Sequence, residues 1–195
     1  MILMSKNIEF EKRVMLTESQ YESLKAYTLN FKNDALTLVN HYFDDEDLSL
    51  IKHHHVLRIR EINDNDAELT LKVKGDNGDL EINESIPHNK VKSLIYSFKL
   101  DNEEIKNEIN KITNKSIKLV TSLKTERIEI EFDDYLFVLD KNYYSDVVDY
   151  DLEIESNDIV KALEVIKKYC HQYGMQYRED YSSKSRRAIN KALNL

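Results

Sequence analysis

Charged side chains recur at every second residue along several apolar segments of this chain. Glu9, Glu11 and Arg13 open the pattern within residues 8–16. Side chains alternate between the two faces of a β-strand, so residues two apart share one face. The later members of the pattern are Arg58, Arg60, Lys72, Lys74, Arg127, Glu129, Asp151, Glu153 and Glu155. Charged faces on many strands, each with an apolar back, indicate a sheet that closes around a charged interior.

The cations of this pattern predict an anion-binding site. Cations that face one another repel unless an anion lies among them, and the oxygens of a triphosphate match the fork of a guanidinium group. We therefore expect a triphosphate-containing small molecule as the ligand. The cations expected to bind it are Arg13, Arg58, Arg60, Lys72, Lys74 and Arg127.

The acids of the pattern predict divalent metal ions. Carboxylate oxygens are ligands that Mg²⁺ or Mn²⁺ uses together with substrate phosphates. One ion would bridge phosphate oxygens as a Lewis acid, and a second ion or a carboxylate would orient the attacking water. The acids expected to bind metal are Glu9, Glu11, Glu153 and Glu155. Such a lining could carry out metal-assisted phosphoryl chemistry.

A structural explanation also exists for each pair of charges. Taken singly, either basic pair of the third and fourth predicted strands would fit a solvated surface sheet. Glu153 and Glu155 could instead form cross-strand ion pairs with those cations. The functional interpretation therefore depends on all the pairs facing one interior.

The elements that must position these residues are mainly strands. About eight segments alternate in the way that is typical of β-strands, and polar turns separate several of them. The predicted strands cover residues 6–16, 35–44, 56–62, 67–74, 79–86, 117–132, 135–144 and 147–155. The segment 117–132 is either one long strand or two strands with a bend.

Helices are predicted between and after the strands. Thr17 and Gln20 can form a capping box for a first helix. Residues 88–113 predict a pair of amphipathic helices over an outer face, and residues 158–173 predict another helix. The chain therefore reads as α+β, with an eight-stranded antiparallel closed β-barrel and flanking helices.

A last helix is predicted to open at residues 182–188. Lys184 and Arg187 are three residues apart there and share a face. The chain has only 3 glycines and no glycine-rich phosphate loop, which argues against a P-loop or dinucleotide fold.

Length and composition set the remaining limits. A chain of 195 residues is long enough for one domain, expected to span residues 1–195. The net charge of −8 argues against a general nucleic-acid or anionic-membrane surface. The single Cys170 excludes an internal disulfide, and a reducing, cytoplasmic setting fits best. No apolar run approaches the length of a membrane span.

The first charged segment resembles a known family signature. Residues 9–13, Glu-Phe-Glu-Lys-Arg, are similar to the Glu-x-Glu-x-Lys signature of the CYTH domain, the superfamily of triphosphate tunnel metalloenzymes. The resemblance covers nearly the whole chain and is most similar to the small Gram-positive bacterial branch. It continues through Tyr42-Phe43-Asp44, Leu57-Arg58-Ile59-Arg60, Leu71-Lys72-Val73-Lys74, Glu81, Thr125-Glu126-Arg127, Leu139-Asp140, residues 150–155, and Ser183-Lys184 with Arg187.

The resemblance implies roles for particular residues. It implies an eight-stranded tunnel whose cations, now including Lys184 and Arg187, bind the triphosphate. It adds Asp151 to the metal ligands Glu9, Glu11, Glu153 and Glu155. The residues it implies in catalysis are Glu9, Glu11, Arg13 and Lys184.

One position departs from the signature, because Arg13 stands where the family has lysine. The charge is kept, but a guanidinium is neither a compact ammonium nor readily deprotonated. Lys12 cannot replace it, because on a regular strand it faces the other way.

The expected function is a metal-dependent triphosphatase that cleaves the terminal phosphoanhydride. Relatives implied by the resemblance include thiamine triphosphatases, inorganic triphosphatases and class IV adenylyl cyclases. The alternatives are therefore an adenylyl cyclase on the same fold and a non-catalytic nucleotide or polyphosphate binding module. The sequence leaves the choice of triphosphate open, and also the oligomeric state, for which a homodimer is one option.

Overall fold

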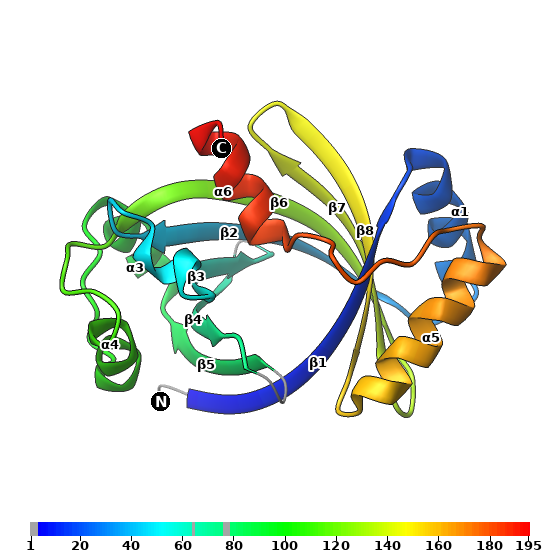
Figure 1. Ribbon diagram of the computed structural model, residues 1–195, viewed down its shortest axis with the longest axis horizontal. Coiled ribbons are helices and arrows are strands. Elements are labelled where there is room, and N and C mark those ends of the chain that lie inside the picture. Colours follow the sequence, from blue (N-terminus) through cyan, green and yellow to red (C-terminus); the bar gives the residue numbers. More distant parts are fainter. Residues whose placement is uncertain (1–3, 64, 76–78) are drawn as a thin grey trace. The chain divides into compact units, whose positions relative to one another are not determined.

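The computed structural model describes residues 4–63, 65–75 and 79–195, with the backbone alone for residues 4–9 and Asp79. Within these residues the chain forms eight strands and six helices (Figure 1). The strands are β1 (Met4–Leu16), β2 (Asp34–Asp44), β3 (His55–Ile62), β4 (Asp66–Val73), β5 (Asp79–Ile86), β6 (Lys118–Glu131), β7 (Leu136–Tyr144) and β8 (Val147–Ser156). The helices are α1 (Glu18–Thr28), α2 (Ser49–Lys52), α3 (His88–Tyr96), α4 (Glu103–Asn110), α5 (Ile159–Gln172) and α6 (Lys184–Leu193).

The strands form one antiparallel sheet, as the alternation predicted. Hydrogen-bonded neighbours follow the order β1-β5-β4-β3-β2-β6-β7-β8. The long predicted segment 117–132 is a single strand, β6, rather than two. The α+β prediction, with an eight-stranded antiparallel sheet and flanking helices, is confirmed.

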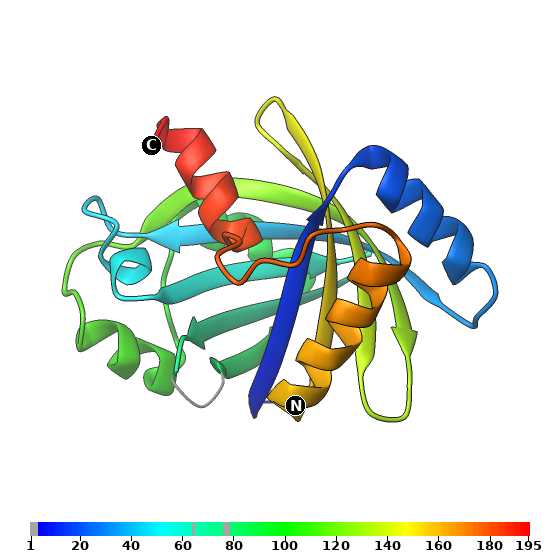
Figure 2. The ribbon, with the colours of Figure 1, turned by 45° about the vertical axis from the view of Figure 1, so that its right-hand side comes forward.

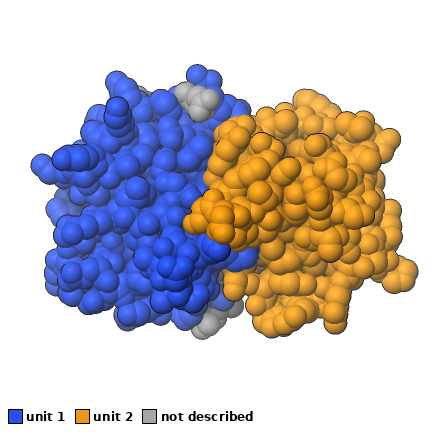
Figure 3. Space-filling view, turned by 90° about the horizontal axis from the view of Figure 1, so that it is seen from above, with its two compact units in different colours: residues 1–8, 39–123, 184–195 blue, residues 9–38, 124–183 orange. Residues whose placement is uncertain are grey.

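The chain divides into two compact units (Figure 3). Unit 1 contains residues 1–8, 39–123 and 184–195, and unit 2 contains residues 9–38 and 124–183. Each unit has its own apolar core.

The core of unit 2 lies between the sheet and two helices. The strands contribute four fully buried side chains to this core, namely Val14, Phe137, Leu152 and Ile154. α1 and α5 contact β8 on this side, and α5 lies along β8 in both ribbon views (Figures 1 and 2). Side chains alternate between the two faces of a strand. The residues between these buried ones on β1, β6, β7 and β8 therefore lie on the face of the sheet that points away from the helices.

Local signals fix where the helices of unit 2 begin and end. The predicted capping box is present, because Thr17 Oγ1 accepts from Gln20 N and Gln20 Oε1 accepts from Thr17 N at 2.9 Å. α5 ends at Gln172, and Gly174 just beyond it has a left-handed φ of 63° that favours glycine. The Met175 amide then donates to the Cys170 carbonyl at 2.8 Å and closes the last turn.

The core of unit 1 lies between β3 to β5 and two helices. Leu57, Ile59 and Leu71 are buried on the strands, and Ile105 and Ile109 are buried from α4. α3 contacts β3 and β4. The prediction of a helix pair in residues 88–113 is confirmed. Arg58, Arg60 and Lys72 alternate with these apolar residues and therefore face away from the core.

None of the helices in the described part of the chain is long and apolar enough to cross a membrane.

Candidate functional site

Strand register gathers the acids of unit 2 on one face. Arg13 of β1 pairs with Glu153 of β8, and Glu11 pairs with Glu155. Asp140 of β7 pairs with Asp151 of β8. Paired residues on antiparallel strands have neighbouring side chains, so several carboxylates lie close together on this face of the sheet.

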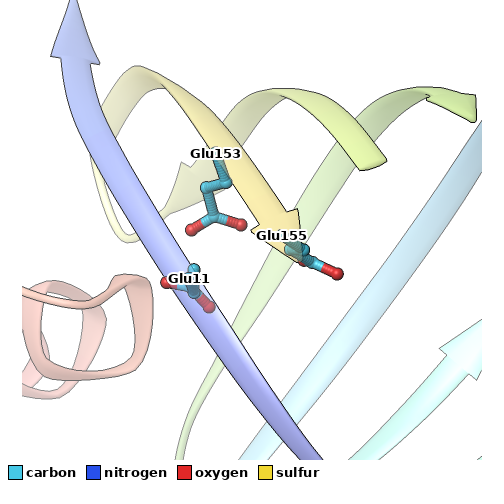
Figure 4. Close-up of side chains that lie close together, drawn as sticks. All are labelled: Glu11, Glu153 and Glu155. Carbon is cyan, nitrogen blue, oxygen red and sulfur yellow. The ribbon is translucent and has the colours of Figure 1, made fainter. Parts of the chain in front are cut away.

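Three of these carboxylates converge in a group that could hold a metal ion. One oxygen from each of Glu11, Glu153 and Glu155 lies within 4.8 Å of the other two (Figure 4). Asp140, Asp151 and Glu153 form a second such group, in which every residue is buried. The donor sets are all carboxylate oxygen, which fits a hard divalent ion such as Mg²⁺ or Mn²⁺. Glu153 belongs to both groups.

Arg13 bridges the acids of the first group. Its Nε donates to Glu153 Oε1 at 2.7 Å, and its Nη2 forms an ion pair with Glu11. One planar guanidinium thus contacts two carboxylates at once, which the single point of an ammonium does less well. Arg13, which stands where the family signature has lysine, therefore contacts two members of the acid group directly.

Arg127 is held from three sides by carboxylates. Its Nε and Nη2 donate to the two oxygens of Asp140, each at 2.9 Å. Nη2 also donates to Glu153 Oε2 at 3.3 Å, and Nη1 donates to Glu129 Oε1 at 3.2 Å. Burial by itself would lower the pKa of Arg127, but the charge and hydrogen bonds of Asp140, with Glu153, raise it well above its usual value. This buried cation is permanently charged.

Unit 1 carries a basic group on β3 and β4. Lys72 Nζ lies 3.2 Å from Glu81 Oε1, and Arg58 Nη2 lies 3.9 Å from Glu81 Oε2. Arg60 Nε donates to Asn40 Oδ1 at 2.9 Å. The Nε of Arg58 is buried and has no hydrogen-bond partner among the described residues. A buried donor of this kind is suited to an anion.

Glu81 is the acid that links these cations. It is 7% exposed, and burial alone would raise the pKa of its carboxyl. The charges of Arg58 and Lys72 outweigh that effect and hold the pKa below its usual 4.5. Glu81 therefore stays ionised and partly neutralises the basic group.

The lowered pKa of Glu81 gives a prediction about acid stability. A carboxyl whose pKa is lower in the folded state contributes stability that is present above the unfolded pKa and lost as pH falls through the folded value. We expect Glu81→Gln to lower the melting temperature at pH 7, and the difference from wild type to shrink as pH falls below about 4.5. Thermal melts between pH 3 and pH 7 measure it.

The control for this prediction is Glu22→Gln, which changes an exposed carboxylate on α1. Its melting temperature should follow that of wild type at every pH. A difference between wild type and Glu81→Gln that stays constant from pH 7 to pH 3 would contradict the assignment.

The other residues predicted for the site differ in how exposed they are. Lys74 is exposed just beyond the end of β4, unlike Lys72. Lys184 and Arg187 are partly exposed in the first turn of α6, within unit 1. Asp151 is fully buried on β8. The side chain of Glu9 lies outside the described residues.

Asp140 was not among the predicted site residues, although a signal for it exists. The predicted turn at Asp133-Asp134 makes β6 and β7 a hairpin, and residues equally far from that turn are cross-strand partners. Counting outward from the turn pairs Arg127 with Asp140, which is the observed register.

Comparisons with known proteins agree over almost the whole chain. A family model described as the CYTH domain matches residues 7–188. The "Putative triphosphatase YjbK" of Bacillus subtilis (strain 168) is 32% identical over 178 residues, which cover 90% of this chain and 92% of that protein.

Solved structures share the fold. A Bacillus halodurans protein described as "a putative adenylate cyclase" matches with a TM-score of 0.82 and 25% identity, over 93% of this chain and 97% of that one. The "Putative adenylyl cyclase HpAC1" of Hippeastrum, described as having a dominant triphosphatase activity, matches with a TM-score of 0.76 over 94% of this chain and 95% of that one. At 17% identity the second likeness concerns the fold alone.

Proposed function

Since the chain belongs to the CYTH domain family, we propose that it is a divalent-metal-dependent triphosphatase. The bond it cleaves is the terminal phosphoanhydride of inorganic triphosphate or of an organic triphosphate. The observation that carries this proposal is the convergence of Glu11, Glu153 and Glu155 in unit 2. The name of the B. subtilis relative at 32% identity supports the same reaction.

The acids of unit 2 are proposed to hold Mg²⁺ or Mn²⁺. A bound ion supplies positive charge that stabilises phosphate oxygens and the attacking water. Glu11, Glu153 and Glu155 would hold it, with Asp151 and Glu9 as further ligands. Arg13 contacts Glu11 and Glu153, and we propose that its guanidinium would also bind a phosphate oxygen of the substrate.

The cations are proposed to bind phosphate oxygens. In unit 1 these are Arg58, Arg60 and Lys72, with Lys184 and Arg187 from α6. The buried Nε of Arg58 supports this role, because a phosphate oxygen would give it a partner. Lys74 is exposed beyond its strand and would contact a ligand only at the periphery.

Barrel closure and a single domain over residues 1–195 are parts of the same proposal. β1 pairs with β8, and it is also next to β5 in the strand order. β1, β2 and β6 each have residues in both units, which supports one folding domain. We also propose a reducing, cytoplasmic setting, because Cys170 is a free, buried thiol.

A second candidate is an adenylyl cyclase, favoured by the description of the B. halodurans structure at 25% identity. The two reactions differ in their products. A triphosphatase releases inorganic phosphate, whereas a cyclase converts ATP to cyclic AMP and pyrophosphate.

The test is product identification with inorganic triphosphate, ATP and thiamine triphosphate, each with Mg²⁺ or Mn²⁺. We expect inorganic phosphate from at least one of them and no cyclic AMP from ATP. Cyclic AMP with pyrophosphate would support the cyclase instead. Tight, metal-linked binding of triphosphate without any product would support the binding module.

A further inference from the structure

A buried polar network lies beside the second acid group of unit 2. Its centre is Asn142 on β7, whose side chain is 0% exposed. The Asn142 Nδ2 donates to Asp151 Oδ2 at 2.8 Å and to Asp149 Oδ1 at 3.0 Å. Its Oδ1 accepts from the Thr125 hydroxyl at 2.8 Å. The strand register explains the arrangement, because Asn142 pairs with Thr125 on one side and with Asp149 on the other.

The chemistry of the partners fixes which way the amide points. Ionised carboxylates can only accept hydrogen bonds, so the NH₂ end must face Asp149 and Asp151. The Thr125 hydroxyl donates to the other end, and a flipped amide would lose both bonds to the carboxylates. Asn142 therefore presents one N–H to Asp151 and the other to Asp149 in one fixed orientation.

Asp151 needs such a support because of its neighbours. It is fully buried, and it lies directly opposite Asp140 in the sheet. Oxygens of Asp140, Asp151 and Glu153 lie within 4.8 Å of one another. Arg127 donates to Asp140 and Glu153 of this group, whereas Asn142 donates to one oxygen of Asp151 and so fixes the orientation of that carboxylate.

We propose that Asn142 is a positioning residue that holds the Asp151 carboxylate toward the divalent ion proposed for the acids of unit 2, for which Asp151 is a further ligand. This inference rests on the proposed function, because it assigns Asn142 to the metal proposed there. Partners that hydrogen-bond a metal ligand orient it, and their loss costs about 10–100-fold in metal affinity or activity. The site keeps its carboxylates in a variant at Asn142 but loses their alignment.

Tyr144 provides the matched control. Its hydroxyl donates to Asp149 Oδ2 at 2.5 Å, at the side of the network away from Asp151. Tyr144→Phe removes one bond from the network and leaves the bond from Asn142 to Asp151 in place. If the network only stabilised the fold, Asn142→Leu and Tyr144→Phe would have similar effects on the affinity for Mn²⁺.

The experiment is calorimetric titration of Mn²⁺ into metal-free wild type, Asn142→Leu and Tyr144→Phe, with circular dichroism to check the fold. We expect Asn142→Leu to bind Mn²⁺ about 10–100-fold more weakly than wild type. Tyr144→Phe should stay within about twofold of wild type. Equal affinities for wild type and Asn142→Leu would overturn the inference.

A replacement variant and the wild-type titration itself distinguish the remaining outcomes of the experiment. If Asn142→Leu does not fold, Thr125→Val serves instead, because it keeps the side-chain shape but removes the bond that orients the amide. Thr125→Val should then bind Mn²⁺ at least about threefold more weakly than Tyr144→Phe, and equal affinities would overturn the inference. Wild type that binds no Mn²⁺ would overturn the proposed function itself, together with this role for Asn142.

Discussion

Glu153→Gln is expected to lower the rate of metal-dependent phosphate release by about 10²–10³-fold. A metal that acts as a Lewis acid contributes several kcal/mol, and each 1.36 kcal/mol is a factor of ten in rate. Glu153 is the one acid shared by the two carboxylate groups of the described residues, and it is 1% exposed. Glutamine keeps the size of the side chain but removes the charge that the metal needs.

The same substitution also removes one ionic partner from Arg13 and one from Arg127. Arg13 contacts Glu153 Oε1 and Arg127 contacts Glu153 Oε2, so neither keeps its ionic partner at this position. Steady-state rates at saturating Mg²⁺ or Mn²⁺ measure the effect. Glu131→Gln is the control, because Glu131 is an exposed carboxylate at the end of β6. A Glu153→Gln rate within a few fold of wild type would show that the two acid groups do not hold the catalytic metal.

Arg127→Met is expected to destabilise the fold by about 3–5 kcal/mol, because it breaks a buried ion pair and leaves its acids uncompensated. Asp140 is fully buried, and Arg127 donates a hydrogen bond to each of its two carboxylate oxygens. For a chain of this length the loss corresponds to a fall in melting temperature of about 6–20 °C. Calorimetric melts measure it.

A double variant separates the ion pair from simple packing. Replacing a whole buried ion pair with apolar residues is often neutral in stability, whereas removing one partner is not. Arg127→Met combined with Asp140→Leu should therefore recover at least about half of the stability that Arg127→Met alone loses. If the double variant is less stable than Arg127→Met, the loss does not come from an uncompensated Asp140.

Much of the charged face could be predicted from the sequence, because alternation along a strand is a local signal. The spacing of Glu11 and Arg13, or of Glu153 and Glu155, already assigns each pair to one face. Alternation does not say which strands are neighbours. The pairing of Arg13 with Glu153 joins residues 140 positions apart and is visible only in the sheet. The CYTH resemblance is confirmed, whereas the roles that it implies for individual residues remain proposals.

The sequence includes Asp140 in the family resemblance without giving it a role, and it does not indicate Asn142. Asp140 and Asn142 interrupt an otherwise ordinary strand, and neither belongs to a paired charged motif. Their importance arises from cross-strand partners, namely Arg127 for Asp140 and Asp151 for Asn142. Lys74 illustrates the opposite case, because its spacing matches Lys72 while the strand ends one residue earlier.

Metal dependence at the carboxylates of unit 2 is decided by phosphate release from inorganic triphosphate by EDTA-treated protein, before and after adding Mg²⁺ or Mn²⁺. Wild type and Glu153→Gln are compared in the same assay. We predict no release in EDTA, recovery by wild type when metal is added, and no comparable recovery by Glu153→Gln. Release that persists in EDTA, or equal recovery by both proteins, would contradict a metal-dependent reaction at the carboxylates of unit 2.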